Sequence, residues 1–345
     1  MGRLLLYGAY GYTGRLVTER VRAKGMDAIV AGRDEGRTRA LAARQHLDAR
    51  AFDLADAAAH FDGVTTVLNL AGPFSKTARP MVDACLARGV NYVDITGEIA
   101  VFEALHARGN EAGAAGVVLL PGAGFDVVPS DCLAAHVHRR LPGATELQLA
   151  IGGLSDISRG TARTALESID AGTLARRDHD IVVLAPTPRG TADFGKGLRP
   201  TIGMSWGDVA TAYYSTGIPD IDVMFEASPE VQRMANLPPV ARRFMASRLG
   251  QWLGGKAIDR MPAGPGESVR ESARGFLIGE ARDRDGNVAV AELEPPEAYK
   301  LTAMTALEAA LRIDRGDVKP GYHTPSTAFG PDFILGFPGV SRRDL

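Results

Sequence analysis

Short apolar runs alternate with segments of helical periodicity over the first 130 residues of the chain. The runs lie between glycines or polar turns, at residues 4–7, 28–31, 50–52, 66–70, 92–95 and 117–120. Strands of a parallel sheet read as continuously apolar because helices cover both faces of the sheet. The pattern therefore predicts an α/β fold whose N-terminal domain contains a doubly wound parallel sheet.

The pattern changes after Pro142 to longer runs in which apolar and polar residues alternate. These runs lie at residues 146–151, 181–184, 201–206, 220–225, 275–280 and 288–293. Alternation is typical of antiparallel strands with one face in water. Helical segments are expected at 160–170, at 229–253 with an interruption at Pro238 and Pro239, and at 298–312. We predict a second, α+β domain built on a largely antiparallel sheet.

The length of the chain fits two domains, since 345 residues exceed one ordinary core. We expect residues 1–130 to form a nucleotide-binding domain that residues 315–345 complete. Residues 131–314 are then the substrate domain.

A glycine triplet follows the first predicted strand and precedes a helical segment. Gly8, Gly11 and Gly14 are each three residues apart. This spacing allows a tight turn that brings backbone N–H groups to a pyrophosphate at the helix N-terminus. We predict a Rossmann dinucleotide site. The loop residues expected to contact the cofactor are Gly8, Tyr10, Gly11, Tyr12, Thr13 and Gly14.

Arg33 follows the second predicted strand, where an enzyme that uses NAD usually has a carboxylate for the adenosine ribose. A guanidinium suits a 2′-phosphate because it offers several charge-assisted hydrogen bonds in one plane. We therefore predict NADP(H) as the cofactor. In the alternative, Arg33 is a solvated loop cation and Asp34 binds the ribose.

Three further strand ends supply cofactor candidates. Asp53 and Leu54 follow the third strand and could meet the adenine, although Asp53 could equally cap the next helix. Small residues after the fourth and sixth strands would let the backbone pass close to the diphosphate and the nicotinamide ribose, although ordinary turn chemistry explains them nearly as well. These residues are Ala71, Gly72, Pro73, Phe74 and Gly124.

Polar side chains after the fifth and sixth strands are the catalytic candidates. Thr96, Glu98 and Asp126 should flank the nicotinamide, where they could transfer a proton or orient the substrate. The structural alternative is that Glu98 caps the helix that follows it and Asp126 hydrogen-bonds loop backbone. Ser130 or Asp131 is expected to cap a helix over residues 132–140.

The second domain offers two weaker signals. Ser158, Arg159 and Thr161 open its first helix and could bind a carboxylate or a thioester carbonyl, while plain capping explains them as well. Apolar residues interleaved with arginines between residues 231 and 253 could face an acyl chain or a membrane surface. At helical spacing they are more often ordinary core.

Composition narrows the class of protein. A net charge of −2, with both signs mixed along the chain, argues against nucleic acid as a partner. Cys85 and Cys132 lack metal-ligand spacing, which favours a reducing compartment and no structural metal. No apolar run reaches the length of a transmembrane helix, so we expect a cytoplasmic protein. The Tyr/Lys relay of short-chain reductases, the Gly-x-Ser-x-Gly elbow and the His-Glu-x-x-His motif are all absent.

With these residues identified, the chain resembles the saccharopine dehydrogenase-like family of NADP-binding reductases, and within it the branch of bacterial trans-acting enoyl reductases. The resemblance extends over nearly the whole length. It implies a Rossmann domain completed by the C-terminal segment, with an inserted substrate domain. The motifs that carry it lie at residues 8–15, 31–33, 69–74, 92–98, 124–131, 215–219 and 324–326.

These observations predict an NADPH-dependent oxidoreductase that transfers hydride to an activated C=C bond, such as that of an enoyl thioester on a carrier. Two alternatives stay open. One is imine reduction or amine oxidation of the saccharopine dehydrogenase type, with Arg159 and Arg163 binding a carboxylate. The other is a non-catalytic NADP(H)-binding partner protein. The sequence also leaves a homodimer open.

Overall fold

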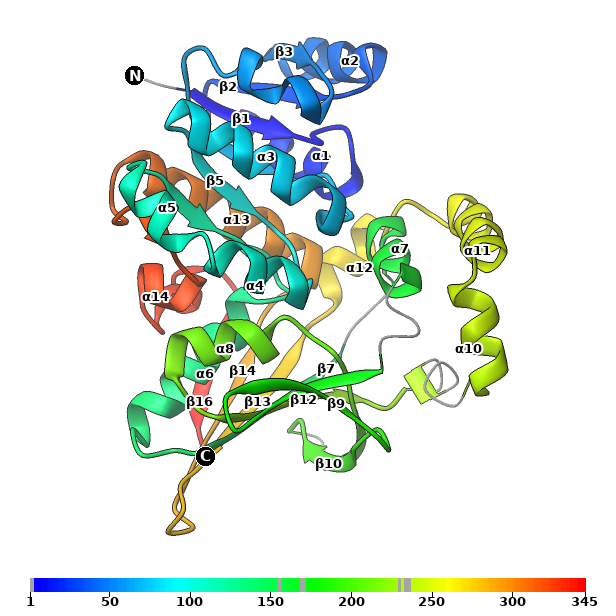
Figure 1. Cartoon of the computed structure of the whole chain (residues 1–345), viewed down its shortest axis with the longest axis vertical. Coiled ribbons are helices and arrows are strands. Elements are labelled where there is room, and N and C mark those ends of the chain that lie inside the picture. The colour runs from blue at the N-terminus through cyan, green and yellow to red at the C-terminus, as the bar shows by residue number, and fades with distance from the viewer. Residues whose placement is uncertain (1–2, 154–156, 168–171, 196, 229–230, 233–236) are drawn as a thin grey trace. The chain divides into compact units, whose positions relative to one another are not determined.

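The computed structural model describes residues 3–153, 157–167, 172–195, 197–228, 231–232 and 237–345 (Figure 1). The chain divides into two compact units. The first contains Met1–Val128 and Ala298–Phe337, and the second contains Pro129–Glu297 and Pro338–Leu345.

These bounds differ from the expected ones at two places. Helix α13 (Ala298–Asp314), expected in the substrate domain, lies in the first unit because its buried face packs into the core of the parallel sheet. Strand β16 (Ser341–Asp344), expected to complete the nucleotide-binding domain, lies in the second unit because it pairs with β14 (Val288–Glu294).

The first unit is built on the predicted parallel sheet. Its strands are β1 (Arg3–Tyr7), β2 (Ala28–Gly32), β3 (Asp48–Ala51), β4 (Val64–Asn69), β5 (Asn91–Asp94), β6 (Val118–Leu120) and β15 (Gly321–Tyr322). They lie in the order β15-β6-β5-β4-β1-β2-β3, and every pair is parallel. The order reverses between β1 and β4, which is where doubly wound sheets bind their ligands.

Helices cover both faces of this sheet (Figure 1). Alternate residues of β1 explain why: Leu4 and Leu6 point into one core, and Leu5 and Tyr7 into the other. The first core is closed by α1 (Tyr12–Ala23), α2 (Glu35–Gln45) and α13. The second is closed by α3 (Phe74–Arg88), α4 (Ile99–His106), α5 (Gly109–Ala114) and the 3₁₀ helix η1 (Leu54–His60). The short helices α14 (Pro325–Phe329) and η2 (Phe333–Gly336) follow β15.

The second unit contains a mixed sheet of nine strands among the described residues. The strands are β7 (Glu146–Gly152), β8 (Thr173–Arg177), β9 (Asp180–Leu184), β10 (Arg189–Asp193), β11 (Leu198–Gly203), β12 (Asp220–Glu226), β13 (Phe276–Arg282), β14 and β16. Their main order is β10-β11-β12-β7-β13-β14-β16, with β8 pairing β12 and β9. Only the β12–β7 pair is parallel among these described pairs, so the predicted α+β domain with a largely antiparallel sheet is confirmed.

One helix boundary and one expected buried segment are corrected in this unit. Helix α6 (Val128–Arg140) begins four residues earlier than expected, so Ser130 and Asp131 lie buried within it and are not caps. Pro129 suits the first turn of a helix, which favours the earlier start. The expectation that the apolar residues of 231–253 are ordinary core is wrong for five of them, which are 45–81% exposed: Val240, Phe244, Leu249, Trp252 and Leu253. The remaining helices are α7 (Arg159–Glu167), α8 (Asp208–Thr216), α10 (Pro239–Ala246), α11 (Arg248–Arg260) and α12 (Glu267–Ser272).

Candidate functional site

The loop between β1 and α1 has the features of a phosphate-binding turn. The backbone N–H of Gly11 donates to the carbonyl of Gly8 at 2.9 Å, which closes the turn directly before the helix. Gly11 is the N-cap of α1, no side chain caps this helix, and its first turn carries no acidic residue. The partial positive charge of the helix N-terminus is therefore left for an anion.

Two of the loop glycines are required by close packing. Gly8 has a φ of +80°, and a Cβ built on it would lie 2.8 Å from the Cβ of Ala71. A Cβ on Gly14 would lie 2.6 Å from the carbonyl oxygen of Ala9. The loop after β1 therefore touches the loop after β4, which contains Ala71 and Gly72. This cradle fits a dinucleotide, because its backbone can approach a diphosphate without side chains in between.

Cationic side chains gather at the end of β2. Arg33 is exposed, and the Arg37 guanidinium lies 4.3 Å from the centroid of the Tyr10 ring, which packs over Gly32. Neither arginine forms an ion pair with any described residue. Asp34, the alternative ribose ligand, accepts a hydrogen bond from the Arg37 N–H at 2.9 Å and thereby caps α2. An anion at this corner would meet two uncompensated positive charges.

Asp53 and Leu54 follow β3, as predicted. Asp53 occupies the N-cap position of η1 without a side-chain cap bond, and its surface is exposed. Leu54 is partly buried and packs against the core on the α3 face. Asp53 thus lies where a capping residue would lie, but its side chain makes no capping hydrogen bond.

A buried polar network that the sequence analysis missed joins the ends of β4, β5 and β6. The Tyr92 hydroxyl donates to Asp94 Oδ2 at 2.7 Å, and Asp94 Oδ1 accepts the backbone N–H groups of Thr96 and Gly122, each at 2.9 Å. Asn69 Nδ2 donates to the Tyr92 hydroxyl at 3.2 Å. Polar residues within otherwise apolar strands were the signal that could have revealed it, because buried polar groups need partners.

Burial sets the protonation of this network. It raises the pKa of Asp94 to about 6 and that of Tyr92 well above its ordinary value. Hydrogen bonds from Thr96, Tyr92 and Gly122 favour the carboxylate of Asp94 and partly oppose the effect of burial. The network therefore holds the strand ends in a fixed arrangement around one buried acid.

Glu98 is committed to the start of helix α3. Its Oε1 accepts the N–H of Phe74 at 2.7 Å, and its Oε2 accepts the N–H of Ser75 at 2.8 Å. Glu98 occupies the N-cap position of α4 but makes no cap bond there, so the alternative in which Glu98 caps the helix that follows it is wrong. The buried Thr96 hydroxyl accepts the N–H of Glu98 at 3.0 Å. Both side chains fix the loop that carries Ala71 and Phe74.

Asp126 differs from these groups because its carboxylate has no hydrogen bond or ion pair with any described residue. It follows β6 and lies beside Gly97, where a Cβ would be 3.0 Å from Asp126 Oδ2. Its surface is partly exposed, yet desolvation raises its pKa to about 7. An acid that titrates near neutrality and lacks a partner can exchange a proton with a substrate.

The backbone before Asp126 is fixed from helix α13. The hydroxyl of Thr302 accepts the N–H of Phe125 at 2.9 Å, and a Cβ on Gly124 would lie 3.0 Å from Thr302 Cγ2. The Thr305 hydroxyl donates to the carbonyl of Ala123 at 2.7 Å. Gly124 is thus held close to the strand ends, and its contact with the cofactor stays a prediction.

In the second unit, Ser158, Arg159 and Thr161 make the bonds of an ordinary helix start. Ser158 Oγ accepts the N–H of Thr161 at 3.3 Å, and Arg159 Nε donates to the carbonyl of Met261 at 2.6 Å. The Arg163 guanidinium pairs with Asp259. These contacts bear out the capping geometry, and a substrate role for the three residues stays a prediction.

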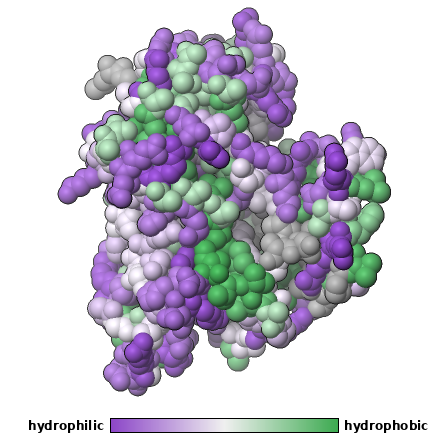
Figure 2. Space-filling model, viewed as in Figure 1, coloured by the Kyte–Doolittle hydropathy of each residue, from purple (hydrophilic) through white to green (hydrophobic). Residues whose placement is uncertain are grey.

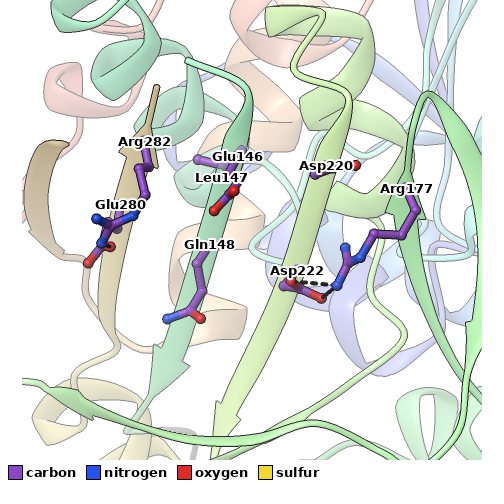
Figure 3. Close-up of a pocket in the computed structure, with 8 residues that line it drawn as sticks. All are labelled: Glu146, Leu147, Gln148, Arg177, Asp220, Asp222, Glu280 and Arg282. Atoms are coloured by element: carbon purple, nitrogen blue, oxygen red, sulfur yellow. Dashed lines mark hydrogen bonds and ion pairs between the residues drawn. The ribbon is translucent and has the colours of Figure 1, made fainter. Parts of the chain in front are cut away.

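A hollow of about 390 Å³ lies on the sheet of the second unit (Figure 3). The Arg177 guanidinium donates to both carboxylate oxygens of Asp222, at 2.7 and 2.8 Å, and Arg282 pairs with Glu280 at 2.8 Å. Most of its lining residues are charged, and two arginine–carboxylate pairs lie among them, unlike in an acyl-binding slot. The lining residues are Glu146, Leu147, Gln148, Arg177, Asp220, Asp222, Glu280 and Arg282.

The part of the chain that the structure describes was expected to lack a metal site, and its potential metal ligands are scattered. Within it, no group of three His, Cys, Asp or Glu residues could hold a metal ion. Cys85 and Cys132 are both buried and unbridged, and burial raises the pKa of the Cys85 thiol far above its ordinary value.

Comparisons with known proteins agree with this geometry. Residues 4–120 match the model of the saccharopine dehydrogenase NADP-binding domain. The trans-acting enoyl reductase of Mycobacterium tuberculosis (strain H37Rv) is 26% identical over 401 residues, which cover 98% of this chain and 96% of that protein. A saccharopine dehydrogenase-like oxidoreductase of Rattus norvegicus is 29% identical over 216 residues, 54% of this chain and 50% of that protein.

Among solved structures, the apo saccharopine dehydrogenase (L-Glu forming) of Saccharomyces cerevisiae aligns with a TM-score of 0.64. The alignment covers 100% of both chains at 13% identity. At that identity the likeness shows a shared fold.

Proposed function

This chain is an NAD(P)-binding oxidoreductase of the saccharopine dehydrogenase family, and from that premise we propose that it uses NADPH to reduce the activated C=C bond of an enoyl thioester. The similarity to the trans-acting enoyl reductases extends over nearly all of both chains, which supports the choice of an acyl substrate. Resemblance of fold alone would leave the substrate open.

The observation that carries the choice of cofactor is the uncompensated charge at the end of β2. Arg33 is exposed and forms no ion pair with a described residue, and Arg37 lies on the Tyr10 ring beside it. A 2′-phosphate would neutralise charge that a ribose hydroxyl would leave unpaired. Asp34, whose carboxylate caps α2, is the weaker candidate for a ribose ligand.

The residues that would hold NADPH follow from the cradle. The pyrophosphate would bind at the N-terminus of α1 over the loop of residues 8–14, and Asp53 and Leu54 would border the adenine. The loop of residues 71–74, together with Gly124, would border the nicotinamide ribose. When bound, NADPH would supply a hydride to the β-carbon of the enoyl group.

The remaining chemistry belongs to the protein. Reduction needs one proton at the α-carbon, and Asp126, with its pKa of about 7, is the group we propose to deliver it or to orient the acceptor. Backbone N–H groups near Gly97 and Gly124 would stabilise charge on the thioester oxygen. Thr96 and Glu98 would act by positioning these loops, and Ser158, Arg159 and Thr161 would orient the acyl group.

The test is the consumption of NADPH with enoyl thioesters of coenzyme A and of a carrier protein, with a cyclic imine as the competing substrate. We expect saturated thioester and NADP⁺ in equal amounts, and no turnover of the imine. Preferred reduction of the imine would overturn the proposed substrate but not the cofactor. Absence of NADPH binding would overturn both.

A further inference from the structure

Helices α10 and α11 expose large apolar side chains to solvent. Figure 2 shows hydrophobic residues at the surface over these helices, at the right of the view. Exposed aliphatic and aromatic groups this close together on a soluble surface mark an interaction site. The residues and their exposed fractions are Val240 81%, Phe244 51%, Leu249 56%, Trp252 59% and Leu253 45%.

The exposed apolar residues of α11 lie on one face of the helix, and the packed residues lie on another. Leu249 and Leu253 are four residues apart, with Trp252 beside them, so the three form a continuous stripe. Gly254 lies on the opposite side, where a Cβ would be 2.6 Å from Leu166 Cδ2 of α7. The glycine face packs against the protein, and the stripe is left to solvent.

Positive charge accompanies the stripe. Residues 239–260 contain five cations and a single acid, Asp259, whose carboxylate is paired with Arg163. Lys256 and Arg260 continue the face of Leu253 by helical spacing, and both are exposed. The chain as a whole has a net charge of −2, so this concentration of cations is local. The five cations are Arg242, Arg243, Arg248, Lys256 and Arg260.

We propose that α10 and α11 dock the protein on an anionic membrane surface. A helix with an aromatic and aliphatic face bordered by Lys and Arg lies in the interface plane, where its apolar groups enter the acyl boundary and its cations meet acidic head groups. Trp252 has the amphipathic ring that favours this depth. Within the described residues, no helix is long and apolar enough to cross a bilayer, so the contact is peripheral. The inference does not depend on the proposed reaction.

The full chain is tested by flotation with vesicles of phosphatidylcholine alone and of phosphatidylcholine mixed equally with phosphatidylglycerol. We expect binding to the mixed vesicles, little binding to the neutral ones, and loss of binding at high salt. The chain has only two tryptophans, so a Trp206→Phe background isolates Trp252. Its emission should shift to the blue on binding.

Two variants separate the contributions. Trp252→Glu and the double variant Lys256→Glu with Arg260→Glu should each lower the apparent vesicle affinity by about tenfold or more. Leu198→Glu is the matched control, because Leu198 is 73% exposed on β11 and should leave vesicle binding unchanged. Thermal unfolding of each variant monitors the fold.

Three outcomes would overturn the proposal. The first is a failure of the unmutated protein to bind the mixed vesicles. The second is binding that survives Trp252→Glu. The third is a concentration-dependent dimer in sedimentation that Trp252→Glu abolishes in the absence of lipid, because the stripe would then be covered by a second copy of the chain.

Discussion

At the residue scale, we expect the side chain of Arg33 to decide which cofactor the first unit prefers. Arg33→Ala should weaken NADPH binding by about 10- to 100-fold, since charge-assisted hydrogen bonds contribute about 1.5 to 3 kcal/mol. NADH binding should barely change, and Arg37→Ala should have a smaller effect in the same direction. Isothermal titration with both cofactors measures this.

Arg39→Ala provides the matched control. Arg39 lies on α2 and is exposed, as Arg37 is, but Arg39 pairs with Glu35. It should leave both affinities unchanged. Equal affinity of the unmutated protein for NADPH and NADH would contradict the assignment of Arg33.

Asp126 should make the stability of the protein depend on pH. Its pKa is about 7 in the folded state and 3.8 for an ordinary aspartate. Between pH 3.8 and pH 7, the folded protein therefore keeps a proton that the unfolded chain has already released. Stability therefore falls as pH rises through this window, and the loss is complete above pH 7. Asp126→Asn should be more stable than the unmutated protein at pH 8 by about 1 to 2 kcal/mol, after screening by solvent, and nearly equal to it at pH 4. Denaturant unfolding at the two pH values measures it.

The same substitution should lower turnover by about 100-fold if Asp126 delivers the proton. A deprotonated Asp126 has no proton to donate, so kcat/KM of the unmutated protein should fall above pH 7, and the substitution should remove this fall. Glu98→Gln is the contrasting variant: both Glu98 oxygens accept N–H groups of α3, so it should cost about 1 kcal/mol of stability and little turnover. Full activity of Asp126→Asn per folded molecule would remove Asp126 from the site.

At the scale of elements, the parallel sheet and its glycine loop were predictable because both leave a periodic or spaced signature. Continuous apolar runs identified six of the seven strands of the first unit but not the two-residue strand β15, and the glycines marked the turn into α1. The parallel pairing of β7 with β12 could not be predicted, because alternation of apolar and polar residues shows that one face of a strand is in water but not in which direction the strand runs. The contacts of Glu98 could not be predicted either, because its partners on α3 are 23 and 24 residues away in the sequence and no local pattern links them.

The two glycines at the start of α1 should respond differently to added side chains. Gly11→Val should abolish NADPH binding while leaving the unfolding of the apo protein nearly unchanged, because a Cβ there has one close contact, 3.1 Å from the Gly8 carbonyl oxygen. Gly14→Ala should destabilise the apo protein by about 1 to 3 kcal/mol, since its Cβ would collide with the backbone of Ala9. Thermal unfolding and NADPH fluorescence separate the two effects, and NADPH binding by Gly11→Val would refute the phosphate loop.

At the scale of the whole molecule, the two units should respond separately to the cofactor. A saturating excess of about 100 times the dissociation constant stabilises a binding unit by about 2.7 kcal/mol. Hydrogen exchange should therefore slow in the loops of residues 8–14 and 71–74, and in β1, β4 and α1. The strands β7, β13 and β14 should serve as the internal reference. Protection confined to the second unit would place the cofactor elsewhere.

The path of the chain through the two units has a consequence for its biosynthesis. The strand β16 pairs with β14, but the ribosome makes residues 298–337 of the first unit between them. Until Ser341–Asp344 emerges, β14 presents an unpaired edge, which in a nascent or truncated chain favours aggregation. A product that stops before residue 341 should therefore depend on chaperones even though its parallel sheet is finished.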